Sequence, residues 1–176
     1  MKPQLNPVPL TFNAIEEKAE TFAREHGFDP QQCSVRVLAK KLGGSIEVLD
    51  TPDIKQLNSG SLRVLKEGVF TIFLSPTTSP LRDNFTIAHE IGHYVLHILP
   101  SELLKNGKII EIGRHGDDRL EQQANRFAAA LLMPRAHFIK VAKDYDCDVT
   151  VLAGRFRVSP QAAQVRLDSL ERAGVL

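Results

Sequence analysis

The sequence of 176 residues predicts an α+β fold, in which a small three-stranded sheet lies over one central helix and further helices occupy both ends of the chain. Three observations predict it. Strand signals, including alternation of apolar and polar residues, are concentrated in residues 45–74. Helical periodicity fills the chain on both sides of that stretch. The central helix follows the last strand directly and contains the pattern H-E-x-x-H at residues 89–93.

Two helices are expected before the sheet. Residues 1–12 contain three prolines and are predicted to form an irregular N-terminal arm. Asn13 and Glu16 match a capping box, which opens the first helix. Ser34 is the expected N-cap of a short second helix that ends at Gly43–Gly44.

Three strands are expected at residues 45–49, 61–66 and 69–74. Glu67 and Gly68 separate the last two strands and can turn the chain between them, so these strands should form a hairpin. The strand at 69–74 is almost wholly apolar, which predicts that it is largely buried.

The central helix has clear start signals and one apolar side. Ser79–Pro80 matches an N-cap followed by a proline in the first helical position. Ile87, Ile91 and Ile98 cluster on the side opposite His89. A helix with a histidine face and an apolar back is expected to be half-buried.

The remaining chain is mainly helical. The stretch 101–118 has mixed signals, with a short strand possible at 108–112 followed by a loop. Further helices are predicted at residues 119–133, 134–145, 148–157 and 159–172. Since no segment has the composition of a linker, residues 13–176 are expected to form a single domain, within which residues 148–176 form a C-terminal pair resembling a helix-turn-helix.

Composition and charge indicate an ordinary globular protein. The net charge of +1 gives no global electrostatic signature of a nucleic-acid or membrane partner. Cys33 and Cys147 are far apart and lack C-x-x-C spacing, as expected for reduced thiols. No apolar run approaches the length of a membrane span, and the N-terminus lacks the apolar core of a signal peptide. We therefore expect a cytoplasmic protein.

The H-E-x-x-H pattern has a chemical reason. Residues four apart lie on one face of a helix, so His89 and His93 can direct their ring nitrogens at one metal ion. Glu90 points about 100° away from His89, so it can reach a water on the metal without being a ligand. This is the arrangement of a zinc peptidase, with Glu90 as the general base.

Such a site needs a third protein ligand. Glu121 is favoured because it lies on a separate helix that can pack beside the first. However, Asp118–Glu121 also matches a capping box, so spacing alone leaves the choice open. His97 lies two turns from His89, too far along a straight helix to share the metal. The downstream candidates are His97, His115, Asp117, Asp118 and Glu121.

Three other residues are candidates for supporting roles. Asn125 lies one turn after Glu121 and can accept a hydrogen bond from a ligand histidine. His97 can support the site or contact substrate in the cleft, although a plain polar role fits equally well. His115 lies in a loop that can approach the metal.

Two segments together resemble the ImmA/IrrE family of zinc metallopeptidases. They are FTIAHEIGHY at residues 85–94 and EQQANRFAAALLMP at residues 121–134. The resemblance covers roughly residues 13–170 and is closest to the short, ImmA-like form. It implies a zincin-like fold, with His89, His93 and Glu121 as ligands of one zinc ion. One departure is Gln123, where many relatives carry a second glutamate.

The family resemblance also implies an activity and a partner. The implied activity is site-specific cleavage of a helix-turn-helix transcriptional repressor, which derepresses mobile-element or stress-response genes. Two imidazoles and a carboxylate also accept manganese or iron, so zinc is the expected metal without excluding these two. The alternative is a non-catalytic regulator of the same fold that binds its repressor and displaces it from DNA.

Two expectations concern how the protein meets its partners. Extended substrate backbone is expected to add as a strand beside Val69–Leu74, next to the central helix. Direct DNA binding by the C-terminal pair is not expected, because nearby acidic residues balance its arginines. These arginines are Arg155, Arg157, Arg166 and Arg172, and the acidic residues are Asp144, Asp146, Asp148, Asp168 and Glu171. The sequence does not indicate an oligomeric state.

Overall fold

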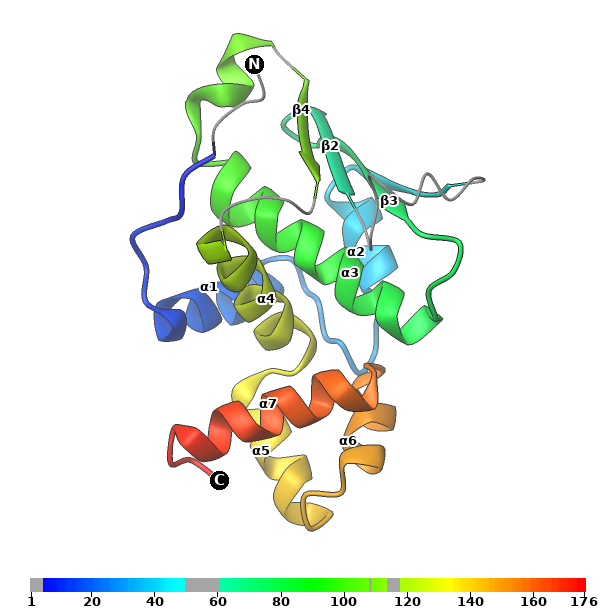
Figure 1. Cartoon of the computed structure of the whole chain (residues 1–176), viewed down its shortest axis with the longest axis vertical. Coiled ribbons are helices and arrows are strands. Elements are labelled where there is room, and N and C mark those ends of the chain that lie inside the picture. The colour runs from blue at the N-terminus through cyan, green and yellow to red at the C-terminus, as the bar shows by residue number, and fades with distance from the viewer. Residues whose placement is uncertain (1–4, 50–60, 108, 114–117) are drawn as a thin grey trace.

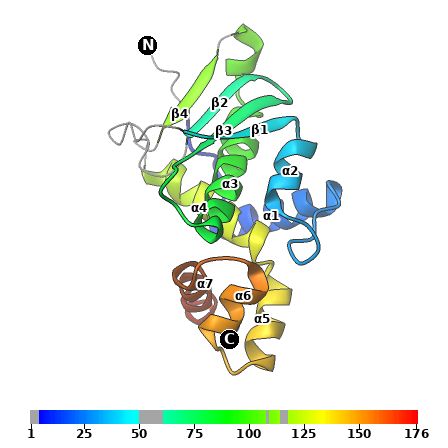
Figure 2. The same cartoon turned by 90° about the vertical axis from the view of Figure 1, so that its right-hand side faces the viewer.

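The computed structural model describes residues 5–49, 61–107, 109–113 and 118–176. A twisted sheet forms the upper layer, and helix α3 (Pro80–His93) runs beneath it (Figure 1, Figure 2). Helices α1 (Phe12–Glu25) and α4 (Asp118–Leu132) lie beneath α3, and the last three helices form a lower lobe (Figure 1). Within the described residues no helix is both long and apolar enough to cross a membrane.

The sheet has four strands rather than the expected three. Strands β1 (Gly44–Val48), β2 (Ser61–Lys66) and β3 (Val69–Leu74) confirm the three predictions. A fourth, β4 (Ile110–Gly113), pairs antiparallel with β2, so the strand order is β1-β3-β2-β4. β4 overlaps the short strand that the sequence made possible at residues 108–112. Its four residues show too little alternation to predict that it joins the sheet beside β2.

The position of β3 contradicts one expectation. β3 pairs in parallel with β1 on one side and antiparallel with β2 on the other. Its apolar side chains Phe70, Ile72 and Leu74 are buried. Since both edges of β3 already carry ladder hydrogen bonds, the prediction that substrate adds beside Val69–Leu74 is wrong.

Helix α3 begins as predicted. The Ser79 side chain accepts the Arg82 N–H, and Pro80 occupies the first turn. Ile87 and Ile91 are fully buried. Beyond His93 the helix continues as a π-helical turn, Tyr94–Ile98, which the periodicity did not predict.

The first helix begins earlier than predicted. Thr11 is the N-cap of α1, and its hydroxyl accepts the Ala14 N–H. The capping box at Asn13 and Glu16 is therefore wrong, because Glu16 is buried in an ion-pair cluster described below. The second helix, α2 (Val35–Lys41), confirms Ser34 as its N-cap.

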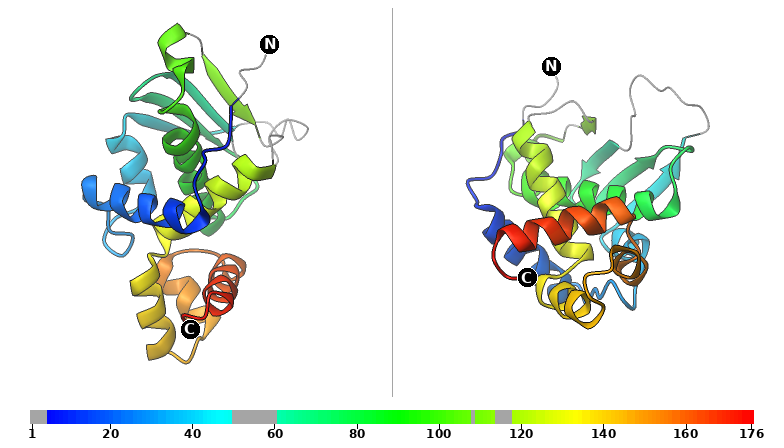
Figure 3. Two further views of the ribbon diagram at one scale, coloured as in Figure 1. Left: turned by 90° about the vertical axis from the view of Figure 1, so that its left-hand side faces the viewer. Right: turned by 60° about the horizontal axis from the view of Figure 1, so that its bottom comes forward.

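The lower lobe contains three helices. They are α5 (Arg135–Asp144), α6 (Val149–Phe156) and α7 (Pro160–Arg172), all within one or two residues of the predicted bounds. Asp148 caps α6 and Ser159 caps α7. Helix α7 lies across the lobe and faces α3 and α4 (Figure 3). A short 3₁₀ helix, Glu102–Asn106, precedes β4.

Candidate metal centre

Three side chains of the predicted site meet between α3 and α4. Nε2 of His89 lies 3.3 Å from Oε2 of Glu121, and Nε2 of His93 lies 3.3 Å from Oε1. The two Nε2 atoms are 3.0 Å apart. The structure therefore brings together two imidazoles and one carboxylate, a group whose donor atoms could hold one metal ion.

The spacing of these donors fits a tetrahedral site. Tetrahedral zinc with ligand distances of about 2.0–2.1 Å separates its ligand atoms by about 3.3–3.4 Å. The observed separations of 3.0 to 3.3 Å come close to that edge length. Neutral imidazole and carboxylate are also the donor types that zinc takes in hydrolytic sites. The residues present therefore fit a zinc ion.

Close packing of the two helices makes this meeting possible. Gly92 faces α4, and a Cβ atom built there would lie 3.1 Å from the Ala124 carbonyl oxygen and 3.3 Å from Cβ of Phe127. A larger residue would push α4 outward. Because Glu121 is one turn before Ala124, the glycine lets the carboxylate reach both histidines.

Asn125 fixes the tautomer of His89. Its Oδ1 accepts a hydrogen bond from Nδ1–H of His89 at 2.8 Å. Since Nδ1 carries the proton, Nε2 of the neutral ring has a free lone pair directed at the site. Asn125 thus occupies the supporting position suggested by its spacing from Glu121.

A chain of hydrogen bonds fixes His93 in the same way. The Gln123 side-chain NH₂ donates to the Val8 carbonyl at 2.7 Å, which leaves its Oε1 to accept the Val8 N–H at 3.0 Å. The same Oε1 accepts Nε2–H of His97 at 3.0 Å. Neutral His97 then accepts at Nδ1 from Nδ1–H of His93, 3.1 Å away. Nε2 of His93 is consequently free to bind a metal.

His97 remains neutral within this series of hydrogen bonds. The pKa of His97 is lowered to about 4, chiefly by burial and also by the neighbouring His93, while the hydrogen bond to Gln123 opposes the shift. Both ring nitrogens are engaged, so His97 has no donor left for a substrate. It holds His93 instead, because the π-helical turn places its ring beside that of His93.

Glu121 is the most exposed of the three candidate ligands. His89 and His93 are 1% and 2% exposed, whereas the Glu121 side chain is 24% exposed. Burial raises the pKa of Glu121, but hydrogen bonds and charge from the two histidines outweigh it and hold the pKa well below its usual range. Glu121 is therefore an anion at neutral pH. Its two oxygens face the two imidazoles, one oxygen to each ring.

Other candidates have different surroundings. Glu90 follows His89 on α3 and is 2% exposed. His115 and Asp117 lie outside the described residues. Asp118 is exposed and does not belong to the cluster. Sequence reasoning missed the contribution of Gln123, which it treated only as a departure from the family pattern.

Comparison with known proteins adds two findings. The family model described as Peptidase_M78, IrrE N-terminal-like domain, matches residues 31–168. The solved structure of a Mycobacterium tuberculosis transcriptional regulator is similar, with a TM-score of 0.59 and 19% identity over 88% of this chain. The alignment covers 46% of that regulator, so this chain spans less than half its length, and at this identity the similarity concerns the fold alone. No curated protein matches the chain significantly.

Proposed function

This chain belongs to the Peptidase_M78 family of IrrE N-terminal-like domains, since the family model spans well over half of it, and on that premise we propose that it is a zinc-dependent endopeptidase. The observation that carries the proposal is the convergence of His89, His93 and Glu121, with hydrogen bonds that leave both Nε2 lone pairs free. This is the protein ligand set of a hydrolytic zinc site, in which the fourth position is left for water or substrate.

Each residue has a proposed role in peptide hydrolysis. A zinc ion bound by the three side chains would polarise the scissile carbonyl and lower the pKa of a water molecule. The Glu90 carboxylate would take a proton from that water, hold it, and release it to the leaving amine. Asn125 and His97 orient the two imidazoles, while α3 and the sheet exclude solvent from behind them.

The proposed substrate is a helix-turn-helix transcriptional repressor, cut at one site. This part rests on the family rather than on contacts within this chain. The helical pair α6–α7, which is helix-turn-helix-like in its connection, is proposed to contact the repressor. Cleavage would lower the concentration of intact repressor and release its genes.

Metal content is the first test. Elemental mass spectrometry should find about one zinc per chain in the wild type and none in His93→Ala or Glu121→Gln. Glu102→Gln, an exposed glutamate on the 3₁₀ helix, is the matched control and should retain zinc. Absence of zinc from the wild type after zinc addition would overturn the proposal.

Cleavage is tested separately from binding. Candidate repressors incubated with the zinc-loaded wild type should yield two fragments on denaturing gels and by mass spectrometry. Glu90→Gln should retain zinc and repressor binding but lose at least about 100-fold in cleavage rate. If Glu90→Gln relieves repression in cells as well as the wild type does, the protein acts by binding, and the endopeptidase assignment is wrong.

A further inference from the structure

A second concave site lies beside the metal centre. A pocket of about 640 Å³ opens between α3, α4 and α7, a volume within the range of ligand sites. Three apolar side chains, Phe12, Phe85 and Val165, line part of its wall. None of the three candidate metal ligands lines it, so the pocket is distinct from the metal centre.

The pocket concentrates positive charge. Four arginines line it, and none of the aspartates and glutamates in the described part of the chain does. The whole chain carries a net charge of only +1. The balance of charge seen along the C-terminal sequence is therefore not kept in the pocket. Arg166 and Arg172 line it, whereas the acidic residues that balance them in the sequence do not. Arg155 lies outside the pocket, over the ring of Tyr145. The pocket arginines are Arg82, Arg126, Arg166 and Arg172.

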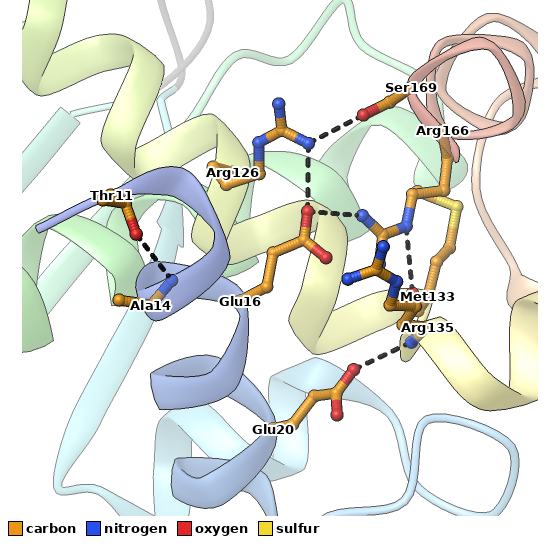
Figure 4. Close-up of polar contacts among 9 residues, drawn as sticks. All are labelled: Thr11, Ala14, Glu16, Glu20, Arg126, Met133, Arg135, Arg166 and Ser169. Atoms are coloured by element: carbon orange, nitrogen blue, oxygen red, sulfur yellow. Dashed lines mark hydrogen bonds and ion pairs between the residues drawn. The ribbon is translucent and has the colours of Figure 1, made fainter. Parts of the chain in front are cut away.

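One buried carboxylate lies behind two of these arginines but does not neutralise both. Oε1 of Glu16 accepts from Nη1 of Arg126 and from Nη1 of Arg166, each at 2.9 Å (Figure 4). Arg166 is 1% exposed, and its Nη2 has no acceptor among the described residues. Two guanidinium groups share one carboxylate, so this wall keeps an excess positive charge, to which the exposed Arg82 and Arg172 add.

The pocket and the metal centre are neighbours along α3 and α4. Thr86 and Arg82 lie about one and two turns before His89, on the same side of α3. On α4 the lining of the pocket includes Gln122 and Asn125, and Asn125 is the residue that accepts the hydrogen bond from His89. A polypeptide with its scissile bond at the metal centre can therefore extend into the pocket along both helices.

We propose that this pocket binds an acidic segment of the polypeptide substrate, so that the arginines select substrates with a carboxylate near the cleavage site. The proposal rests on the proposed function, since it takes the polypeptide to be bound at the metal centre. Arg82 and Arg172 at the rim would contact the carboxylate. The phenylalanines and Val165 would contact the aliphatic stem or an apolar neighbour.

A binding experiment with the full chain tests this without requiring cleavage. The protein carries Glu90→Gln, and the probes are two fluorescent peptides of equal length with phenylalanine beside either a Glu-Glu or a Gln-Gln pair. Fluorescence anisotropy should give at least about tenfold tighter binding of the acidic peptide at low salt, with the preference falling as salt rises. Arg82→Gln and Arg172→Gln should each reduce the preference about fivefold, while Arg155→Gln leaves it unchanged.

Three outcomes would overturn the proposal. Equal affinity for both peptides would show that the pocket does not select acidic side chains. An equal loss in Arg155→Gln means that the effect is general surface charge. Displacement of the acidic peptide by free glutarate at matching concentration indicates a small-anion site instead of a polypeptide site. If the acidic peptide binds as expected but the wild type cleaves no repressor, the acidic-segment site stands as a binding site and the peptidase assignment fails.

Discussion

The side-chain amide of Gln123 forms two hydrogen bonds with the backbone of Val8, donating to its carbonyl and accepting from its N–H. The two residues are 115 positions apart. Through His97 this pair reaches the ring of His93, so the N-terminal arm belongs to the support of the candidate metal centre. Five predictions follow from this and related features of the structure.

Gln123→Ala should weaken zinc binding by about tenfold or more, because His97 loses its acceptor and His93 loses its fixed tautomer. Competition with a zinc-binding dye measures the affinity. The control is Gln122→Ala, the exposed neighbour on the same helix. Equal zinc affinities of Gln123→Ala and the wild type would show that the hydrogen bonds running from Val8 through Gln123 have no effect on metal binding by His93.

Asn125→Ala should weaken zinc binding by about 10–100-fold, because Nδ1 of His89 loses its partner. The folded structure should be unaffected, since Asn125 lies on an exposed part of α4. Dye competition and circular dichroism on the same samples separate the two effects. A large loss of helicity in the variant would assign Asn125 a role in folding instead.

Gly92→Ala should destabilise the protein by about 1 kcal/mol, because overpacking against α4 costs about 1–3 kcal/mol and the better helix propensity of alanine recovers about 1. Gly154→Ala is the matched control, since nothing lies within 4 Å of a Cβ there. Gly154→Ala should stabilise the protein by up to about 1 kcal/mol. Urea unfolding measures the stability of both variants. A Gly92→Ala variant more stable than the wild type would show that α4 can shift to accommodate the added methyl group without cost.

Glu16→Gln should lower the free energy of unfolding at pH 7 by about 3 kcal/mol, because it leaves two buried or half-buried guanidinium groups without a carboxylate. The exposed Glu17 on the same helix gives the control, Glu17→Gln. Urea unfolding at pH 7 compares the three proteins. A loss in Glu16→Gln no greater than that in Glu17→Gln would contradict a stabilising role for the cluster.

The same cluster makes the free energy of unfolding depend on pH. Burial raises the pKa of Glu16, but hydrogen bonds and charge from Arg166 and Arg126 outweigh it, so the pKa lies below its ordinary value of 4.5. Because the pKa is lower in the folded state than in the unfolded state, the ionised carboxylate stabilises the fold at pH values above the unfolded-state pKa. This stabilisation is lost as the pH falls through the folded-state pKa. The difference in the free energy of unfolding between the wild type and Glu16→Gln should therefore be constant from neutral pH to about pH 5 and become smaller below pH 4.5.

Local signals predicted the secondary structure well. Ser34, Ser79 and Ser159 each cap the helix that they were expected to cap, because the hydroxyl reaches an N–H two or three residues ahead. The capping box at Asn13 failed because Glu16 has stronger partners in Arg126 and Arg166, which are distant in sequence. A sequence shows which nearby residues can cap a helix. It does not show which distant side chains will bind the same carboxylate in the folded protein.

The candidate site was predictable in the part that depends on helix periodicity. The four-residue spacing of His89 and His93 implies one shared face, and a second helix was needed to supply Glu121. The contact between Gln123 and Val8 depends on how the arm crosses α4, for which the sequence contains no periodic signal. The arginine pocket was likewise hidden, because charges balanced along the chain are separated by folding.

The long separation between Val8 and Gln123 also bears on how the protein is made. During synthesis the two histidines leave the ribosome some thirty residues ahead of α4, while the arm that supports them emerges first of all. A nascent chain that ends before α4 has neither Glu121 nor Gln123, so of the three proposed zinc ligands it contains only the two histidines. On the proposed function, tight zinc binding and proteolysis would begin only after α4 has emerged and Gln123 has bonded to Val8.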